Sequence, residues 1–331
     1  MAIFLNILFL ILGMVLLIKG ADYFVSGASA IAKILKVPSL FIGLTIVALG
    51  TSLPELSVSV TSAINNSIDL SVGNIVGSNL LNMLFILGLI AILKPIPLQK
   101  TSKKIELPFF VATTGILMLF GFDIWLNGDT KNVLSRTESI ILIVILILYM
   151  YVLISNAYKK RKSSKLENPE LIQEEQDTNL KVWQIILYVV LGLSAVVFGG
   201  ECVSSTAQFL ALKMGMSEAL VGLTIVALGT SLPELVTSVV AAKKGENELA
   251  LGNVIGSNIM NISLILGSVG LIAKAPISTD IVVDLIILFV TTMIFAWFCI
   301  RKDDISKREG IVLLTLYIAY ITFAIIRNYC F

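Results

Sequence analysis

Hydrophobic residues fill the chain in long stretches, and polar residues gather in the short segments between them. Ten stretches each approach the roughly 20 residues that a helix needs to cross a bilayer. They cover approximately Ile3–Ile18, Ser39–Ile64, Leu70–Leu93, Leu107–Phe122, Ser139–Ile154, Val182–Phe198, Ala219–Ala242, Leu249–Ile272, Ile281–Ile300 and Gly310–Ile326. The pattern predicts an all-α polytopic membrane protein with ten transmembrane helices in the lipid bilayer. No targeting peptide is evident, because Lys19 and Asp22 directly follow the first stretch.

One long polar segment, residues 155–180, separates the first five stretches from the last five. We therefore expect a first five-helix unit at 1–154, a linker at 155–180 and a second five-helix unit at 181–331. Placing the linker in the cytoplasm puts eighteen of the 24 Lys and Arg residues on the cytoplasmic side and five outside. Because cytoplasmic loops are enriched in Lys and Arg, we expect a cell-membrane protein with both termini outside. The linker itself is expected to be a solvated segment of mixed charge rather than a partner-binding site.

Composition narrows the possible functions. The chain is 57% hydrophobic and 14% charged, against about 25% charged in soluble domains. A net charge of +2 gives no basic field for nucleic-acid binding. The absence of histidine excludes imidazole metal ligands and histidine-based catalysis. Three widely spaced cysteines indicate neither a disulfide framework nor a thiolate metal site, so no cofactor is expected.

The two halves of the chain contain the same motif. GLTIVALGTSLPEL occurs at Gly43–Leu56 and again, identically, at Gly222–Leu235, an offset of 179 residues. The same offset aligns Gly73–Gly88 with Gly252–Gly267 at nine identities in sixteen positions. The chain is therefore an internal duplication, and an odd number of helices per unit makes the second unit inverted. Inverted repeats are typical of secondary transporters, whose binding sites lie near the midplane at the repeat interface.

The first motif predicts a broken membrane helix. Pro54 removes a backbone donor, Ser52 is a natural N-cap, and Glu55 completes a Ser-x-x-Glu capping box. The helix that ends before the break leaves carbonyls such as that of Ala48 available for a cation. Glu234 holds the matching position in the second copy. A carboxylate at membrane depth costs about 2.5–3.5 kcal/mol and usually marks an ion pathway, so we expect Glu55 and Glu234 to bind cations.

The second motif supplies amides, hydroxyls and glycines. Asn74, Ser78 and Asn82 are spaced four residues apart and lie on one helix face, as do Asn253, Ser257 and Asn261 in the second copy. Beside them, the glycines at 73, 77, 252 and 256 form GxxxG pairs that let another backbone approach closely. Carboxylate, hydroxyl, amide and carbonyl oxygens favour Ca²⁺, Na⁺, Mg²⁺ or Mn²⁺ over softer metals.

These motifs resemble those of the sodium/calcium exchanger family, whose two repeats carry GTSxPE followed by GNxxGSN. The resemblance covers essentially the whole chain and implies two inverted five-helix halves, with motif regions at 39–93 and 218–272. It implies that Ca²⁺ lies between Glu55 and Glu234, helped by the backbone of Thr51 and Thr230. It also implies that the first and sixth helices slide to alternate access. Na⁺ and Ca²⁺ would bind through the set Ala48, Thr51, Ser52, Glu55, Ser78, Asn82, Ala227, Thr230, Ser231, Glu234, Ser257 and Asn261.

Departures from related families refine the expected coupling. Proton-coupled calcium exchangers tend to carry a carboxylate where this chain has Ser78 and Ser257, which favours Na⁺ coupling. Potassium-dependent members carry Asp where this chain has Asn261, which favours K⁺ independence. The linker, at about 26 residues, is too short for the calcium-sensing domains of large animal exchangers.

The resulting hypothesis is an electrogenic Na⁺/Ca²⁺ antiporter that needs no oligomer. The alternative within the same class is an H⁺-coupled Ca²⁺ or Mn²⁺ exchanger, since carboxylates titrate. A channel would need a pore loop, which the sequence does not contain, and an enzyme would need two carboxylates in differing environments rather than equivalent ones. Asp22 and Glu201 match under the repeat, and either an ion-pair role or a vestibule role fits them.

Overall fold

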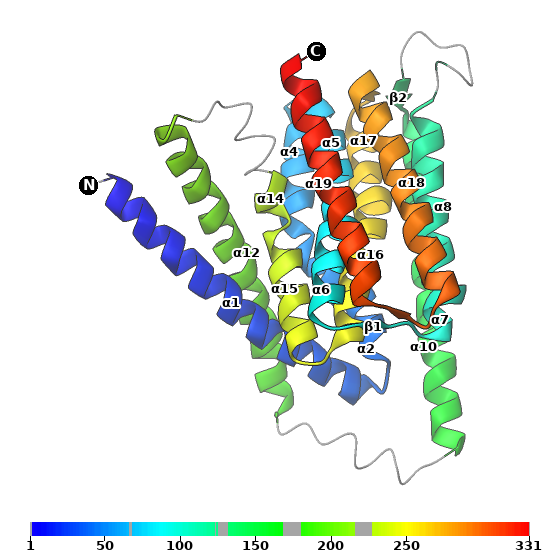
Figure 1. The fold of residues 1–331 in the computed structure, drawn as a ribbon. Coiled ribbons are helices and arrows are strands. Elements are labelled where there is room, and N and C mark those ends of the chain that lie inside the picture. The colour runs from blue at the N-terminus through cyan, green and yellow to red at the C-terminus, as the bar shows by residue number, and fades with distance from the viewer. Residues whose placement is uncertain are drawn as a thin grey trace. The chain divides into compact units, whose positions relative to one another are not determined.

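The computed structural model describes residues 2–65, 68–122, 124, 132–167, 180–215 and 227–330 (Figure 1). The chain divides into two compact units, each assembled from two separate parts of the sequence. Unit 1 comprises Met1–Thr51 and Ile147–Gly256, and unit 2 comprises Ser52–Leu146 and Ser257–Phe331. Two helices, α10 (Arg136–Glu167) and α16 (Asn247–Met260), run from one unit into the other.

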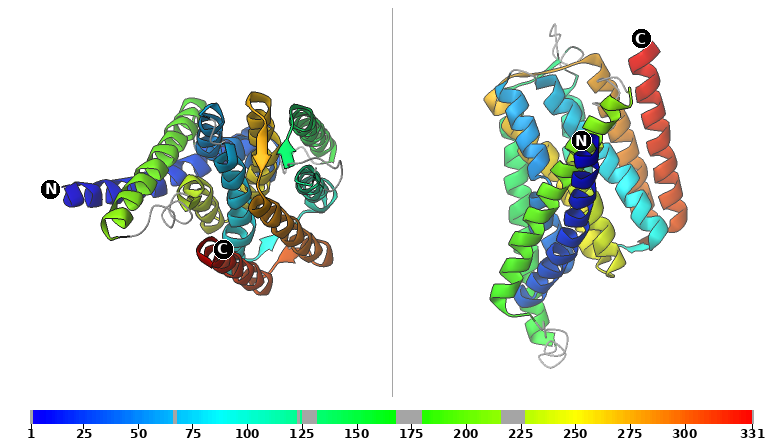
Figure 2. Two further views of the ribbon diagram at one scale, coloured as in Figure 1. Left: turned by 90° about the horizontal axis from the view of Figure 1, so that it is seen from above. Right: turned by 90° about the vertical axis from the view of Figure 1, so that its left-hand side faces the viewer.

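All secondary-structure elements in the described residues of unit 1 are helices. Besides its parts of α10 and α16, its elements are α1 (Ala2–Leu35), α2 (Ser39–Ile42), the π-helical turn η1 (Gly43–Val47), α3 (Ala48–Thr51), α12 (Val182–Lys213), α14 (Ala227–Thr230) and α15 (Leu232–Lys243). Helices α1 and α12 lie side by side (Figures 1 and 2).

Glycines allow α1 and α12 to approach backbone to backbone. A Cβ placed on Gly20 would lie 2.9 Å from the carbonyl oxygen of Gly192, and one placed on Gly199 would lie 2.8 Å from that of Gly13. Contacts this short leave no room for a methyl group. The sequence offset of 179 relates Gly13 to Gly192 and Gly20 to Gly199, so the duplicated glycines face one another within unit 1. Small residues at helix contacts are the usual means of close association inside membranes.

Unit 2 holds the remaining helices and four short strands. Its elements, besides its parts of α10 and α16, are α4 (Leu53–Ile64), α5 (Ile68–Leu80), η2 (Leu81–Ile86), α6 (Leu87–Leu93), β1 (Ile96–Pro97), α7 (Lys100–Lys104), α8 (Glu106–Phe120), β2 (Asn132–Leu134), η4 (Asn261–Leu266), α17 (Gly267–Ile272), β3 (Ala275–Ile277), α18 (Thr279–Arg301), β4 (Asp304–Ile305) and α19 (Lys307–Cys330). Helix α4 packs against α5, α18 against α8, and α19 against α6.

The strands form two small antiparallel pairs that the all-helical expectation did not include. Strand β1 pairs with β4, with Ile96 opposite Ile305, and β2 pairs with β3, with Val133 opposite Pro276. Each pair joins loops at the ends of membrane-length helices. Backbone groups leaving a helix need hydrogen-bond partners, and these strands satisfy some of them.

Seven helices in the described part of the chain are long and apolar enough to cross a membrane, or eight if the interrupted pair Ser39–Thr51 and Leu53–Ile64 is one span. Their outward faces are apolar, with Phe4 of α1 73% exposed and Tyr151 of α10 70% exposed. Exposed apolar surface on this scale indicates a bilayer rather than water around the helices. The molecule is therefore a polytopic membrane protein, and all of its membrane-length elements in the described residues are helices.

Several helices differ from the predicted stretches. Helix α1 continues to Leu35 and α12 to Lys213, beyond the predicted stretches. The hydrophobic pattern misses these ends because they contain polar residues. Helix α8 has 15 residues and falls short of the span length. Helix α10 runs to Glu167, so residues 155–167 of the predicted linker are helical. The linker residues 168–179 and the motif residues 219–226 lie outside the described residues. The inverted ten-helix arrangement itself stays a prediction.

The compact units do not coincide with the two halves inferred from the repeat. Each predicted half, 1–154 and 181–331, contributes residues to both units. The division falls at Thr51 and Ser52 in the first copy of the motifs and at Gly256 and Ser257 in the second. Each unit therefore contains part of both copies, and the functional residues are described below unit by unit.

Candidate cation-binding site

Both predicted helix interruptions are present. In the first copy α3 ends at Thr51 and α4 begins at Leu53, with Ser52 between them. In the second copy α14 ends at Thr230 and α15 begins at Leu232, with Ser231 between them. In each copy the motif's proline lies in the first turn of the new helix, where its missing N–H group does no harm.

The predicted capping boxes are wrong. Ser52 has φ −84° and ψ 8°, Ser231 has φ −93° and ψ 7°, and neither side chain caps its helix. A capping serine needs an extended backbone so that its oxygen can turn back to the N–H groups of the first turn. These two backbones stay close to helical instead, and the carbonyl of Ser52 accepts the Leu56 N–H at 3.0 Å. The serine hydroxyls are therefore not used as caps.

Asn253 joins the two motif segments that lie within unit 1. Its Oδ1 is 3.0 Å from the Thr51 hydroxyl, at the end of α3. Its Nδ2 donates to the Ser238 hydroxyl of α15 at 2.9 Å and is 3.5 Å from the Glu234 carbonyl oxygen. Thr51, Ser238 and Asn253 are all buried. The amide thus connects the residue before the first helix break with the helix that carries the second glutamate.

Glycines bring Asn253 to this position, as the GxxxG pair at 252 and 256 predicts. A Cβ on Gly252 would lie 2.6 Å from the Leu40 carbonyl oxygen, and one on Gly43 would lie 2.5 Å from the Leu249 carbonyl oxygen. Helix α16 therefore rests directly on the backbone of α2 and η1. For Gly73 and Gly77 no atom of the described residues lies within 4 Å of such a Cβ.

Four of the other predicted ligands in unit 1 are also shielded from solvent. Glu234 and Ser231 are 0% exposed and Thr230 is 9% exposed. Ala48 is fully buried, and its carbonyl oxygen is 3.4 Å from the Thr51 hydroxyl. Ala227 is the first residue of α14. Unit 1 thus gathers hydroxyl, amide, carbonyl and carboxylate oxygens in its interior.

Unit 2 contains the other half of the predicted set, and all of it is buried. Helix α4 packs against both α5 and η4, which brings the helix carrying Glu55 against those carrying the polar side chains of the second motif. The exposed fraction is 4% or less for the residues Ser52, Glu55, Ser78, Asn82, Ser257 and Asn261.

Two further asparagines, which are not among the predicted ligands, occupy the same interior. Asn79 Nδ2 donates to the Asn258 carbonyl oxygen at 3.2 Å, and Asn79 Oδ1 accepts from Asn261 Nδ2 at 3.1 Å. Asn79 and Asn258 are equivalent under the 179-residue offset and belong to the GSN of each second motif. That equivalence is the signal in the sequence that points to them, although both positions lie off the helix face that carries Asn74, Ser78 and Asn82 or its equivalent in the second copy.

The asparagines lie where the helices widen. Asn82 is within η2 and Asn261 opens η4, and both segments are π-helical turns. Such turns are rare and occur frequently at functional sites. The sequence predicts regular helix through both positions, because hydrophobic periodicity does not distinguish a π turn from an α turn.

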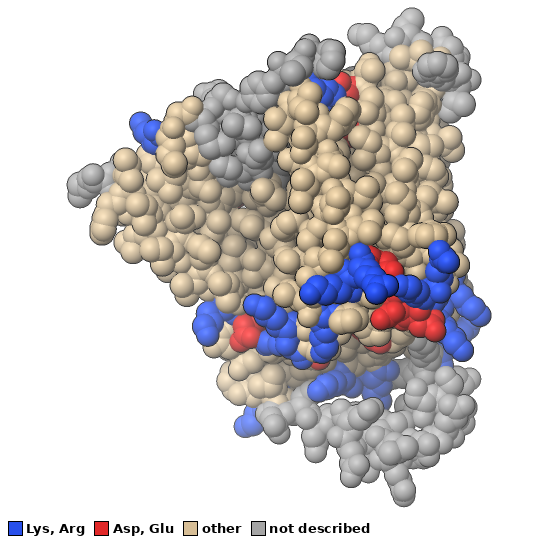
Figure 3. Space-filling view, viewed as in Figure 1, with Lys and Arg blue, Asp and Glu red and all other residues tan. Residues whose placement is uncertain are grey.

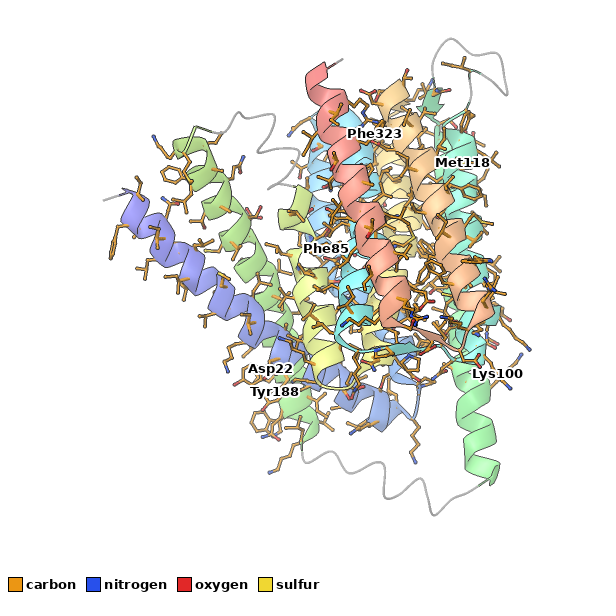
Figure 4. All side chains as sticks on the ribbon, viewed as in Figure 1. Asp22, Phe85, Lys100, Met118, Tyr188 and Phe323 are labelled. Atoms are coloured by element: carbon orange, nitrogen blue, oxygen red, sulfur yellow. The ribbon has the colours of Figure 1, made fainter. Side chains whose placement is uncertain are left out.

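The equivalent acidic residues Asp22 and Glu201 have different roles. Asp22 on α1, labelled in Figure 4, has its carboxylate 2.8 Å from Lys244 Nζ. Lys244 also donates to the Ser26 hydroxyl at 2.6 Å. Glu201 on α12 is exposed and makes no ion pair with the described residues. Asp22 is therefore a structural partner that ties α1 to the end of α15.

Comparison with known proteins identifies the family. The sodium/calcium exchanger protein family matches residues 5–155 and 184–326. The chain belongs to the sodium/calcium exchanger family. The sodium/calcium exchanger MaX1 from Methanosarcina acetivorans is 34% identical over 345 residues, covering 96% of this chain and 97% of that protein. The inner membrane protein YrbG from Escherichia coli is 33% identical over 309 residues, covering 92% of each.

A solved exchanger has the same fold. The sodium-calcium exchanger NCX_Mj, soaked with zero Na⁺ and Ca²⁺, matches with a TM-score of 0.82 and 30% sequence identity, over 97% of this chain and 99% of that one. The exchanger described here is thus a prokaryotic-type calcium/cation antiporter, and its family is one of transporters rather than enzymes.

Proposed function

We propose that this exchanger is an electrogenic Na⁺/Ca²⁺ antiporter that works by alternating access. The observation that carries the proposal is the complete burial of Glu55 and Glu234, two glutamates at equivalent positions of a duplicated motif. No Lys or Arg occurs between residues 39 and 93 or between residues 219 and 242. Buried carboxylates in basic-free helices are stabilised by bound cations or protons, and two negative charges match one Ca²⁺.

The proposed ligands are those that the resemblance to the sodium/calcium exchanger family implies, and the burial of their oxygens in each unit supports them. Ca²⁺ takes the carboxylates of Glu55 and Glu234 and the backbone oxygens of Thr51 and Thr230. Na⁺ ions take the neutral oxygens of the set Ala48, Ser52, Ser78, Asn82, Ala227, Ser231, Ser257 and Asn261, together with the same threonines. Because the two ions share Thr51, Thr230 and the negative charge of one site, their occupancies exclude one another, and mutual exclusion couples their transport in opposite directions.

Na⁺ rather than H⁺ is the coupling ion in this proposal. Ser78 and Ser257 are buried hydroxyls where proton-coupled members tend to carry carboxylates, and a hydroxyl binds Na⁺ without titrating near neutral pH. The neutral Asn261 supports independence from K⁺. We also propose that residues 155–180 face the cytoplasm and that both termini lie outside, as the distribution of Lys and Arg indicates.

Uptake of ⁴⁵Ca²⁺ into Na⁺-loaded proteoliposomes tests this function. Dilution into choline medium creates an outward Na⁺ gradient and should drive uptake, whereas dilution into Na⁺ medium should not. Dilution into K⁺ medium should give the same uptake as choline, because Asn261 adds no second carboxylate. A valinomycin-imposed K⁺ potential should change the rate, because the exchange moves net charge.

Substitutions connect the transport to the buried glutamates. Glu55→Gln and Glu234→Gln should each abolish Na⁺-driven uptake. Each variant should still elute from a size-exclusion column at the position of the unsubstituted protein. Glu201→Gln, an exposed glutamate of α12, is the matched control and should retain uptake. Uptake driven by a pH gradient without Na⁺ would establish the alternative, an H⁺-coupled Ca²⁺ or Mn²⁺ exchanger, and would overturn the role assigned to Ser78 and Ser257.

A further inference from the structure

An apolar groove runs along the outward face of α18 in unit 2. Its volume is about 460 Å³, and its lining is the set Phe289, Val290, Met293, Ile294, Trp297 and Phe298. Val290, Met293 and Trp297 are each about half exposed. The opposite face of α18 is buried against α8, where the rings of Phe110 and Phe295 meet edge to face with centroids 6.5 Å apart. The groove is therefore open to the bilayer that surrounds the helices.

The groove continues into a second hollow with polar walls. This hollow has a volume of about 300 Å³ and is lined by Trp297, Phe298, Arg301, Lys302 and Glu309. Two of these residues, Trp297 and Phe298, line both spaces. The apolar groove therefore leads to a pair of basic side chains at the end of α18.

Arg301 is the basic group of this hollow that is open to a ligand. Its guanidinium lies 4.7 Å from the centre of the Trp297 ring, and it makes no ion pair with the described residues. Its neighbour Lys302 is 2.5 Å from Glu309, which holds the ammonium at the hollow. A guanidinium stacked on an aromatic ring is oriented to present its N–H groups edge-on to a planar or tetrahedral anion.

The surrounding end of unit 2 carries excess positive charge. Residues 94–109 and 301–309 contain eight Lys or Arg and four Asp or Glu. Two of these acids are paired with bases, Glu309 with Lys302 and Asp303 with Lys103. The Lys103 ammonium, 2.8 Å from Asp303, holds the pKa of that carboxyl below its usual value. Figure 3 shows the Lys and Arg side chains gathered over α7 and β1, and Figure 4 labels Lys100 at this end of the unit.

We propose that the groove and hollow bind one anionic phospholipid, with an acyl chain along α18 and the headgroup phosphate at Arg301 and Lys302. The thirteen residues from Phe289 to Arg301 span a rise of about 18 Å, which is close to the roughly 15 Å thickness of one hydrocarbon leaflet. Charge complementarity selects the headgroup, since Arg pairs with phosphate through two parallel hydrogen bonds. Trp297 lies at the junction of apolar and polar walls, where tryptophan is typical of the membrane interface.

Quenching of Trp297 fluorescence tests the site in the folded protein without any transport assay, so its outcome is independent of the proposed function. Replacing Trp125 and Trp183 by Phe leaves Trp297 as the only tryptophan of the three. The protein is reconstituted in phosphatidylcholine vesicles, and brominated phosphatidylglycerol or brominated phosphatidylcholine is added in steps. We expect brominated phosphatidylglycerol to quench Trp297 with about fivefold higher relative affinity, the effect of one basic residue at an anionic headgroup.

Two variants locate the binding site. Arg301→Gln should lower the preference for phosphatidylglycerol by about fivefold. Arg308→Gln, an exposed arginine of the same end that does not line the hollow, should leave the preference unchanged. Arg301→Lys keeps the charge but loses the paired hydrogen bonds of the guanidinium, so its preference should fall between those of the unsubstituted protein and Arg301→Gln. This partial loss tests the site if Arg301→Gln does not fold.

Three results would overturn the proposal. Equal quenching by the two brominated lipids in the unsubstituted protein would show an unselective groove. Equal losses from Arg301→Gln and Arg308→Gln would show diffuse attraction to the basic surface rather than a site. Loss of the preference in Arg301→Lys equal to that in Arg301→Gln would show that charge at the hollow does not select the headgroup.

Discussion

Asn79 and Asn258 occupy equivalent positions in the two second motifs, yet their side chains have different surroundings within unit 2. Both are buried, at 0% and 1% exposed. Asn79 makes two hydrogen bonds, one to the Asn258 carbonyl and one from Asn261. Neither Nδ2 nor Oδ1 of Asn258 has a hydrogen-bond partner among the described residues. Duplicated sequence thus gives one bonded amide and one unbonded amide.

Under the proposed function, the difference separates a structural asparagine from asparagines whose side chains would bind an ion. Asn82, like Asn258, has no hydrogen-bond partner for either side-chain polar atom in the described residues. Buried polar atoms without partners are rare in native proteins, and each needs an explanation such as an ion or a water. Asn82 belongs to the proposed ligand set, and the same reasoning now extends to Asn258. Asn79 instead holds α5 to the end of α16 and the start of η4.

Removing Asn79 should have the largest effect on stability. Asn79→Ala deletes two hydrogen bonds and leaves the Asn258 carbonyl and the Asn261 amide without them, a cost of about 1–3 kcal/mol. We expect the melting temperature in detergent to fall by about 2–4 °C or more. Asn258→Ala, the matched control, deletes no hydrogen bond and should lower it by clearly less. Equal shifts for the two variants would contradict the structural role of Asn79.

The hydrogen bond between Asn79 and Asn261 should be visible as a coupling between the two residues. In a double-mutant cycle, Asn79→Ala and Asn261→Ala should destabilise together by less than the sum of the single variants. The expected coupling is about 0.5–1.5 kcal/mol, the usual net value of one buried hydrogen bond. The cycle is measured by thermal unfolding of all four proteins in the same detergent. Strict additivity would show that the 3.1 Å contact does not stabilise the protein.

Much of this arrangement is predictable from sequence, because duplication and hydrophobicity are strong signals. The identical copies of GTSLPE place both helix interruptions to the residue, and the basic-free stretches identify Glu55 and Glu234 as buried carboxylates. Side-chain geometry at Ser52 and Ser231 is not predictable in the same way. A capping box requires an extended serine backbone, and tertiary packing keeps these serines nearly helical.

The repeat also conceals what distinguishes its two copies. Offset alignment treats Asn79 and Asn258, or Asp22 and Glu201, as the same residue, whereas each member has its own neighbours. The ion pair of Asp22 depends on Lys244, and the residue aligned with Lys244 is Asn65, which has no charge. A pairwise contact needs both partners, so similarity at one position does not carry the contact to the other copy.

Replacing Asn258 by leucine gives the smallest expected change in stability and the sharpest test of why its amide is unbonded. If the amide is kept for a ligand, an apolar side chain of similar size removes buried polar atoms without breaking any hydrogen bond, so the melting temperature without ions should stay within about 1 °C of the unsubstituted protein or rise. The stabilisation produced by Ca²⁺ or Na⁺ should shrink, because a ligand or a water bridge to the ions is gone. Asn79→Leu should do the opposite and lower the ion-free melting temperature. An Asn258→Leu protein that is destabilised without ions would show that the amide contributes to the fold, and the two equivalent asparagines would then differ in partner but not in role.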